Sequence, residues 1–128
     1  MLPKEKGVIA LIFPGQGSQY PGMGKEFYDN WEVARRVFEK ADQVLGFKLS
    51  ELCFEKDEKR SFERLRHWAE SIGDRLHLRF IHKLMEDGQP LLSQTRYSQP
   101  TVFTTSVACY EVFMEELRNR SLNLEAVV

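Results

Sequence analysis

Apolar residues recur at intervals of three and four positions along most of the chain, a spacing typical of amphipathic helices that bury one face. The longest such stretch predicts a helix over residues 31–45, ended by Gly46. Before it, residues 25–28 are expected to form a single helical turn. After it, residues 47–54 predict a short helix with Ser50 near its start. Core packing is the expected role of these helices.

A second long helix is predicted from Tyr97 onward. Pro100 suits its first turn, where a missing N–H costs nothing, and Ser98 is a candidate cap. Apolar residues recur from 102 to 117, so this helix is expected to be mostly buried. Residues 119–123 are polar and predict a turn.

Two short apolar runs differ from the helical pattern. Residues 8–13 are all apolar and rich in β-branched side chains, which predicts a strand buried on both faces that ends at Pro14. Residues 124–128 predict a second buried strand. Two short parallel strands among many helices indicate a helix-rich α/β fold. Gly15 and Gly17 follow the first strand, and a Gly-rich turn there can aim backbone N–H groups at an anion, with a plain tight turn as the alternative.

Residues 56–88 differ in composition from the rest of the chain. They hold eight of the 18 Lys and Arg residues, seven of the 19 acidic residues and all three histidines. Their apolar residues keep helical spacing, and Gly73 lies in the middle of the run. We therefore expect either two antiparallel helices that bend near Gly73 or one long helix with an extended return over residues 86–90.

The histidines and cysteines do not have metal-ligand spacing. His67, His77 and His82 are ten and five residues apart, so no helical face presents two of them together, and we interpret them as solvated side chains. Cys53 and Cys109 are far apart in sequence and are expected to be reduced, buried thiols. No metal site and no cofactor are predicted.

Length and charge narrow the class of protein. The 128 residues are expected to form one domain, 1–128, and 42% hydrophobic with 29% charged residues is ordinary for a globular protein. The net charge of −1 gives no reason to expect a nucleic-acid partner or a membrane surface. No secretory signal and no membrane span are recognised, so a cytoplasmic location is expected.

One motif carries a family resemblance. Phe-Pro-Gly-Gln-Gly-Ser-Gln at residues 13–19, followed by Gly-Met-Gly at residues 22–24, resembles the N-terminal signature of malonyl-CoA:acyl-carrier-protein transacylases. Residues 41–52 and the Tyr-Ser-Gln-Pro segment at residues 97–100 are similar to later parts of the same family. The resemblance covers roughly residues 7–55 and 91–128. It implies an acyltransferase-type, α/β-hydrolase-like domain that acts in fatty-acid synthesis with malonyl-CoA and acyl carrier protein as partners.

The resemblance also implies a serine acyltransferase mechanism. The family's nucleophile lies in a Gly-x-Ser-x-Gly elbow, a histidine activates it, and an arginine holds the malonyl carboxylate. The chain contains no Gly-x-Ser-x-Gly, and Ser18 lacks that spacing, so no catalytic residue is assigned. By resemblance, the backbone N–H of Gln16 belongs to the oxyanion hole and Gln99 lines the acyl pocket. The chain is therefore expected to be an N-terminal fragment of such an enzyme, inactive alone.

Against the family pattern, residues 56–88 are interpreted as a helical insertion, natural or engineered. The alternative function is a binding scaffold that presents this segment to a protein partner, with Leu65, Ile72, Leu76 and Phe80 as the face that binds. A homo-oligomer is also expected, because two apolar strands cannot cover their own edges.

Overall fold

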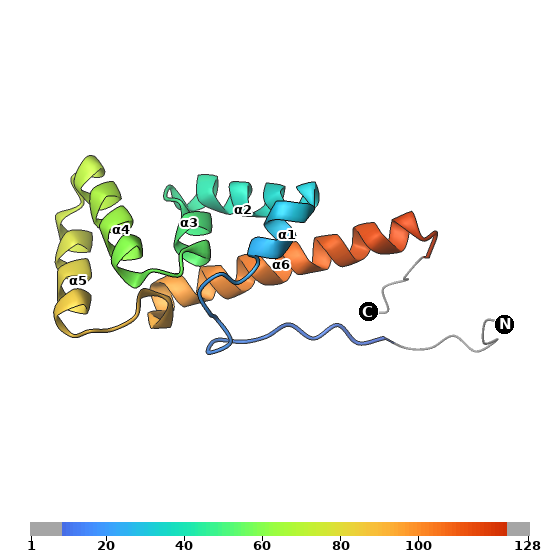
Figure 1. The fold of residues 1–128 in the computed structure, drawn as a ribbon, viewed down its shortest axis with the longest axis horizontal. Coiled ribbons are helices and arrows are strands. Elements are labelled where there is room, and N and C mark those ends of the chain that lie inside the picture. Colours follow the sequence, from blue (N-terminus) through green and yellow to red (C-terminus); the bar gives the residue numbers. More distant parts are fainter. Residues whose placement is uncertain (1–8, 123–128) are drawn as a thin grey trace.

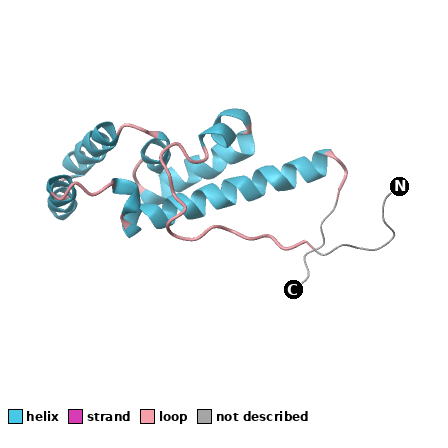
Figure 2. Ribbon diagram, turned by 60° about the horizontal axis from the view of Figure 1, so that its bottom comes forward, coloured by secondary structure: helices cyan, strands magenta, loops and turns pink. Residues whose placement is uncertain are grey.

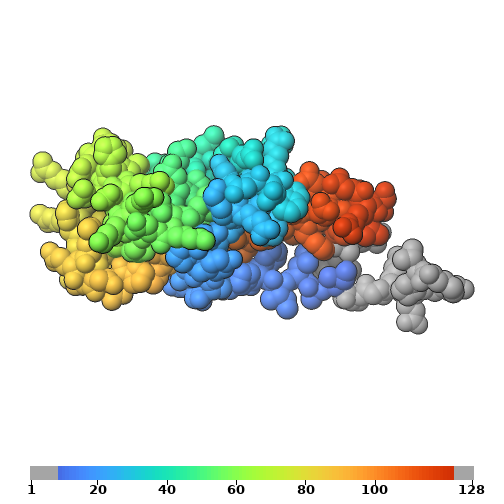
Figure 3. Space-filling model, viewed as in Figure 1, coloured from blue at the N-terminus to red at the C-terminus, as the bar shows by residue number. Residues whose placement is uncertain are grey.

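The computed structural model describes residues 9–122, and helices make up most of that range. In chain order they are α1 (Lys25–Asn30), α2 (Glu32–Leu45), α3 (Leu49–Phe54), α4 (Glu58–Ile72), α5 (Arg75–Glu86), the 3₁₀ helix η1 (Leu91–Ser93) and α6 (Thr95–Asn119). The long α6 forms the axis of the molecule (Figure 1). Helices α1, α2 and α3 pack along it, whereas α4 and α5 form a hairpin at one end. The hairpin also stands out at that end in the space-filling view (Figure 3).

The predicted first strand is not formed. Within the described residues no strand is present, and residues 9–13 run as an extended segment beside α6 (Figure 2). The side chains of Ile9 and Ile12 are 63% and 89% exposed, so the expectation of burial on both faces is wrong. A strand needs a neighbouring strand for its backbone hydrogen bonds, and the described chain offers none. The other predicted strand, residues 124–128, lies outside the described residues.

The helix predictions of the N-terminal half are confirmed. Helix α2 ends at Gly46, whose φ of 76° places it in the left-handed region that closes many helices. Its buried side chains, Ala34 and Phe38, pack with residues of α6, α3 and the loop before α1. The members of this first core are Met23, Ala34, Phe38, Cys53, Ala108 and Val112. Fully buried Phe38 lies at its centre, with its ring 4.9 Å from that of Phe54.

The segment 56–88 folds as two helices that turn at Gly73. Gly73 has a φ of 71°, and its N–H bonds to the last carbonyls of α4. Asp57 and Asp74 cap the two helices by accepting hydrogen bonds from Lys59 and His77 backbone N–H groups. The bend is therefore where the sequence predicted it, and the hairpin is the first of the two expected arrangements.

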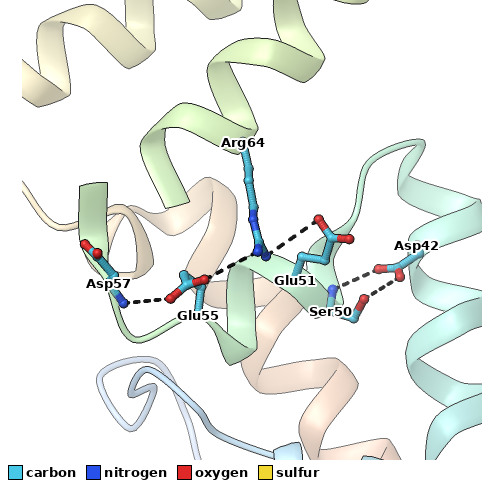
Figure 4. Close-up of polar contacts among 6 residues, drawn as sticks. All are labelled: Asp42, Ser50, Glu51, Glu55, Asp57 and Arg64. Carbon is cyan, nitrogen blue, oxygen red and sulfur yellow. Dashed lines mark hydrogen bonds and ion pairs between the residues drawn. The ribbon is translucent and has the colours of Figure 1, made fainter. Parts of the chain in front are cut away.

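The hairpin does not pack only on itself. Its buried apolar residues form one core with residues that precede and follow the hairpin in sequence. The members of this second core are Leu52, Phe62, Leu65, Ala69, Ile81, Leu84, Leu91, Leu92 and Tyr97. Polar contacts also hold α4 to α3 (Figure 4). Arg64 lies 3.6 Å from Glu55 and 3.8 Å from Glu51, and Glu55 accepts a hydrogen bond from the backbone of Asp57. The second core therefore joins the hairpin to the start of α6.

His77 is not the solvated side chain that the sequence predicted. It is only 6% exposed, its Nε2 is hydrogen-bonded to the hydroxyl of Tyr97, and its ring packs edge-on to Trp68 at 5.2 Å. Burial lowers the pKa of His77 below its ordinary value, Arg96 lowers it further and Asp74 raises it. The interpretation failed because a neutral imidazole with a hydroxyl partner can be buried at modest cost.

The C-terminal helix also differs in detail from its prediction. It begins at Thr95, and the carbonyl of Gln94 accepts hydrogen bonds from the Tyr97 and Ser98 N–H groups. Ser98 is therefore inside the helix and not its cap, and Pro100 lies in the second turn. One face is also open to solvent, since Phe103 is 70% exposed. The expectation of a mostly buried helix holds for only part of its circumference.

Gly24 tests how tightly the first core is packed. Its φ is 81°, and an added Cβ would lie 2.8 Å from the tip of the buried Phe38 ring. We expect Gly24→Ala to lower the free energy of unfolding by about 2–4 kcal/mol, from left-handed strain and overpacking together. Gly46→Ala is the control, because its φ is 76° but nothing lies within 4 Å of the added Cβ. Gly46→Ala should lower the free energy of unfolding by about 1–2 kcal/mol when both variants are measured by urea titration. Equal losses in the two variants would contradict tight packing of Phe38 against Gly24.

His77 should make the stability depend on pH. Because its pKa is lower in the folded state, the unfolded chain binds the proton more readily. The His77 contribution is therefore complete above a pH of about 6.5 and is lost as the pH falls toward the lowered folded-state pKa. Urea unfolding at several pH values should show this loss of stability. His77→Gln should reduce the pH dependence of the free energy of unfolding, whereas the exposed control His67→Gln should leave it unchanged. Identical pH profiles for the two variants would contradict the role given to His77.

Candidate functional site

The structure brings Gln16 and Gln99 to one cleft, although 83 positions separate them (99 − 16). The cleft has a volume of about 440 Å³ and lies between the segment after Phe13 and the first half of α6. Its remaining wall is apolar except for Ser106 and consists of Phe13, Pro14, Val102, Phe103, Val107 and Tyr110. An apolar cleft with a few polar groups is the usual form of a small-molecule site.

The Gly-rich turn is held at the cleft by two contacts with α6. The Nε2 group of Gln16 donates a hydrogen bond of 3.0 Å to Thr95 Oγ1, and the Phe13 ring meets Tyr110 edge-on at 6.3 Å. These contacts lie at successive points along α6, so the segment runs antiparallel to the helix (Figure 1). The Gln16 side chain thus positions the Gly-rich turn against α6, and the Gln16 backbone N–H takes no part in that contact.

The turn itself is a tight loop in which the Gln16 backbone N–H is left without a partner within residues 9–122. Gly17 has a φ of 101°, and its N–H donates to the side chain of Gln19 at 2.8 Å. The Ser18 hydroxyl donates to the Gly15 carbonyl. Among the described residues, no group accepts a hydrogen bond from the Gln16 backbone N–H. This N–H is therefore available to an anionic oxygen.

Several hydroxyls of α6 are buried without a partner. They belong to Ser98, Thr101, Thr105 and Ser106, and the described residues offer no acceptor or donor within hydrogen-bond range of their oxygens. Ser106 lies in the wall of the cleft, and Thr105 lies in the wall of a neighbouring hollow of about 340 Å³ under residues 11–14. Buried hydroxyls are normally paired, so these four are unusual.

The thiols and the phenol near the two cores are not activated. Burial raises the pKa of Cys53 to about 12, and its Sγ donates a hydrogen bond to the Met23 carbonyl. Burial also raises the pKa of Cys109. Burial raises the pKa of Tyr97 to about 12 against the lowering effect of Arg96. Both cysteines are free, and neither is a thiolate at neutral pH.

An apolar surface continues from the cleft across α6 to α2. A groove of about 590 Å³ lies between these two helices, and Phe103 and Val107 line both the groove and the cleft. Val44 on its far side is 73% exposed. Large exposed apolar surfaces of this kind mark places where proteins bind further protein or ligand.

The four residues expected to bind a partner do not share an exposed face. Leu65 is buried in the hairpin core and Phe80 packs against that core, whereas Ile72 and Leu76 are 57% and 79% exposed. The turn at Gly73 changes the direction of the chain, so a single helical register does not run through all four. Partner binding by this segment remains a prediction.

Sequence reasoning missed Thr95, Ser106 and His77. The first two had no signal, because only the tertiary contact places them at the cleft. For His77 a signal existed, since His77, Ile81 and Leu84 follow helical spacing on one buried face of α5. Within residues 9–122, no cluster of His, Cys, Asp or Glu could hold a metal ion, and no helix has the length and apolar character to cross a bilayer.

Comparison with known proteins gives a consistent result. Residues 10–115 match the model of the acyl transferase domain family. A malonyl CoA-acyl carrier protein transacylase of Bacillus subtilis is 30% identical over 109 residues, which is 85% of this chain and 20% of that protein. The protein of the same name in strain 168 is 38% identical over 107 residues, or 84% of this chain and 24% of that protein.

A solved structure agrees with the sequence matches. The malonyl CoA-acyl carrier protein transacylase of Clostridium perfringens ATCC 13124 superposes with a TM-score of 0.52 at 29% identity, over 88% of this chain and 24% of that one. The chain therefore spans between a fifth and a quarter of the length of these three relatives.

The unpaired hydroxyl of Ser98 gives a test of the α6 environment. Ser98 is fully buried, and its oxygen has no partner among the described residues. We expect Ser98→Ala to raise the free energy of unfolding by about 1 kcal/mol, because it removes an unsatisfied polar group. Ser50 is the control, since it is also buried but bonds to Asp42 through its N–H at 2.9 Å and its hydroxyl at 2.6 Å (Figure 4).

Ser50→Ala should lower the free energy of unfolding by about 1.5–3 kcal/mol, as expected for a lost hydrogen bond to a carboxylate. Chemical denaturation of the two variants beside the parent chain measures both effects. Destabilisation by Ser98→Ala would mean that its hydroxyl has a partner in solution.

Proposed function

The chain belongs to the acyl transferase family, and we propose that it supplies the N-terminal part of the acyl site of a malonyl-CoA:acyl-carrier-protein transacylase. The observation that carries this proposal is the cleft in which Gln16 and Gln99 meet. The family resemblance gave these residues separate roles, and the fold places both in the lining of one cavity.

In the proposed reaction, a serine hydroxyl attacks the malonyl thioester and a histidine takes its proton. The C–S bond then breaks, and the histidine returns the proton to the sulfur, so that coenzyme A leaves as the thiol. The former carbonyl oxygen becomes an oxyanion in the tetrahedral intermediate. The free N–H of Gln16 would donate one hydrogen bond to that oxyanion, a contribution of about 3–4 kcal/mol when nucleophile and base are present. The Gln16 side chain holds the turn in place through Thr95.

The apolar wall supports a pocket for the acyl thioester. Gln99 adds an amide that can donate or accept a hydrogen bond, while Phe103 and Tyr110 supply apolar surface to the wall. The nucleophile is expected to come from a Gly-x-Ser-x-Gly elbow, which these 128 residues do not contain. We therefore propose that the 128-residue chain does not transfer malonyl groups by itself.

The extent of the exposed apolar surface supports a site completed by more polypeptide. The relatives are four to five times longer than their matched region, since that region is 20–24% of their length. The cleft, the α2–α6 groove and the extended segment 9–13 form the surface on which the remaining part of such an enzyme would lie. Association of two copies of this chain over the same surface remains a prediction.

Reconstitution tests the proposal. The chain is incubated with malonyl-CoA, alone and together with the part of the Bacillus subtilis strain 168 relative that follows the matched region. Intact-mass analysis should find no malonyl adduct on this chain, whereas the mixture should carry malonyl on a serine of the added polypeptide and pass it to acyl carrier protein. A stoichiometric adduct on Ser18 of the chain alone would contradict the proposal.

Variants of Gln16 provide the control within that experiment. Gln16→Pro removes the backbone N–H and should lower the transfer rate about 10²- to 10³-fold. Gln16→Ala keeps the N–H and loses only the exposed hydrogen bond to Thr95, so a much smaller loss is expected. Equal losses in the two variants would assign the effect to the turn and not to the donor.

A further inference from the structure

The outer face of α5 carries a row of unpaired cations. Arg75, Arg79 and Lys83 follow one another at four-residue intervals, so they lie on one side of the helix, and His82 lies beside them. All four are exposed. Among the described residues, no carboxylate lies within 4.0 Å of the cationic groups of Arg75, Arg79 or Lys83. We call these four residues the α5 stripe.

The neighbouring helix α4 is different, although it is also rich in arginine. Arg60 lies 3.8 Å from Asp57, Arg66 lies 3.8 Å from Glu70, and Arg64 lies between Glu51 and Glu55 (Figure 4). Each arginine of α4 thus has an acid within the chain. The net charge of the whole protein is only −1, so the α5 stripe is a local positive feature and not part of a generally basic surface.

Apolar side chains are exposed next to the α5 stripe. Leu76 follows Arg75 directly and is 79% exposed, and Ile72 at the end of α4 is 57% exposed on the other side of the Gly73 turn. Exposure of two aliphatic side chains beside three cations creates a surface that is both positive and apolar. Such a surface complements a helix that carries carboxylates beside an aliphatic residue.

The opposite face of α5 is not available for binding. Ile81 and Leu84 are buried in the second core, and His77 is hydrogen-bonded to Tyr97. Because its apolar face is already covered, α5 cannot lie in a bilayer interface as an amphipathic membrane helix does. The same packing keeps the α5 stripe in a fixed position, which lowers the entropy cost of binding.

We propose that the α5 stripe, with Leu76 and Ile72, binds an acidic amphipathic helix of a protein partner. Arg75 to Lys83 spans eight residues, or about 12 Å, which matches two turns of a partner helix. Duplex nucleic acid would need a longer positive track, and Glu86 and Asp87 stand directly beyond the α5 stripe. This interaction goes beyond the proposed acyltransferase role and uses none of the residues at the cleft.

A peptide-binding experiment on the whole chain tests the proposal. The probe is a fluorescein-labelled helical peptide of about 18 residues, long enough for five turns, with Glu and Leu on adjacent faces. Its anisotropy gives the Kd. Arg75→Gln, Arg79→Gln and Lys83→Gln together should weaken binding about tenfold or more at low salt, because they remove three positive charges from the binding surface.

A matched variant controls for net charge. Arg60→Gln, Arg64→Gln and Arg66→Gln together remove the same number of positive charges from α4, and should change the Kd by less than about twofold because those charges are already paired. Leu76→Ser should also weaken binding. Charge reversal of the α5 stripe (Arg75→Glu, Arg79→Glu, Lys83→Glu) should transfer the preference to a peptide with Lys in place of Glu.

Four results would overturn the proposal. The first is that the acidic peptide does not bind, and the second is that the α4 and α5 variants lose equal affinity for it. The third is that the α5 stripe binds duplex DNA or vesicles containing anionic lipid more tightly than the peptide, and the fourth is that charge reversal does not change the preference to the Lys peptide. Circular dichroism confirms that each variant is folded. Because the readout is peptide binding and not malonyl transfer, its outcome is independent of the reconstitution experiment.

Discussion

Phe38 lies fully buried between α2 and α6, and the placement of the other elements depends on that contact. The Phe38 ring leaves no room for a side chain at position 24, so only glycine fits there. At this glycine the loop after the Gly-rich motif leads into α1, and residues 9–19 lie alongside α6. The cleft at Gln16 and Gln99 lies between that segment and α6.

A second constraint acts at the other end of α6. Tyr97 is fully buried among residues of the hairpin core, and its hydroxyl bonds to His77 on α5. Tyr97 is two residues from Gln99, so the same turn of α6 packs in the hairpin core and lines the cleft. The hairpin thus shares a core with the start of α6, although the outer faces of α4 and α5 remain exposed. The cleft and the α5 stripe therefore lie on different parts of the molecule.

Most of the exposed large apolar residues lie on α6, α2 and the extended N-terminal segment, and a smaller number lie on the α4–α5 hairpin, namely Ile72, Leu76 and Met85. Under the proposed function, the rest of the acyltransferase would cover the apolar positions of α6 and α2. The unpaired hydroxyls of Ser98, Thr101, Thr105 and Ser106 also lie on α6, and they are unusual because buried hydroxyls are normally hydrogen-bonded.

The sequence by itself determined the family, most helices and the bend at Gly73, because these depend on local spacing, on glycine conformation and on short motifs. It also named Gln16 and Gln99, but only through resemblance. Tertiary structure decided the rest. The run at residues 9–13 has strand composition, yet a strand exists only with a hydrogen-bonding neighbour, and the described residues provide none. His77 is polar by composition but buried by its contact with Tyr97, and the four expected partner-binding residues were divided by the turn between two helices. Each of these outcomes depends on a contact between residues distant in sequence, which local patterns do not encode.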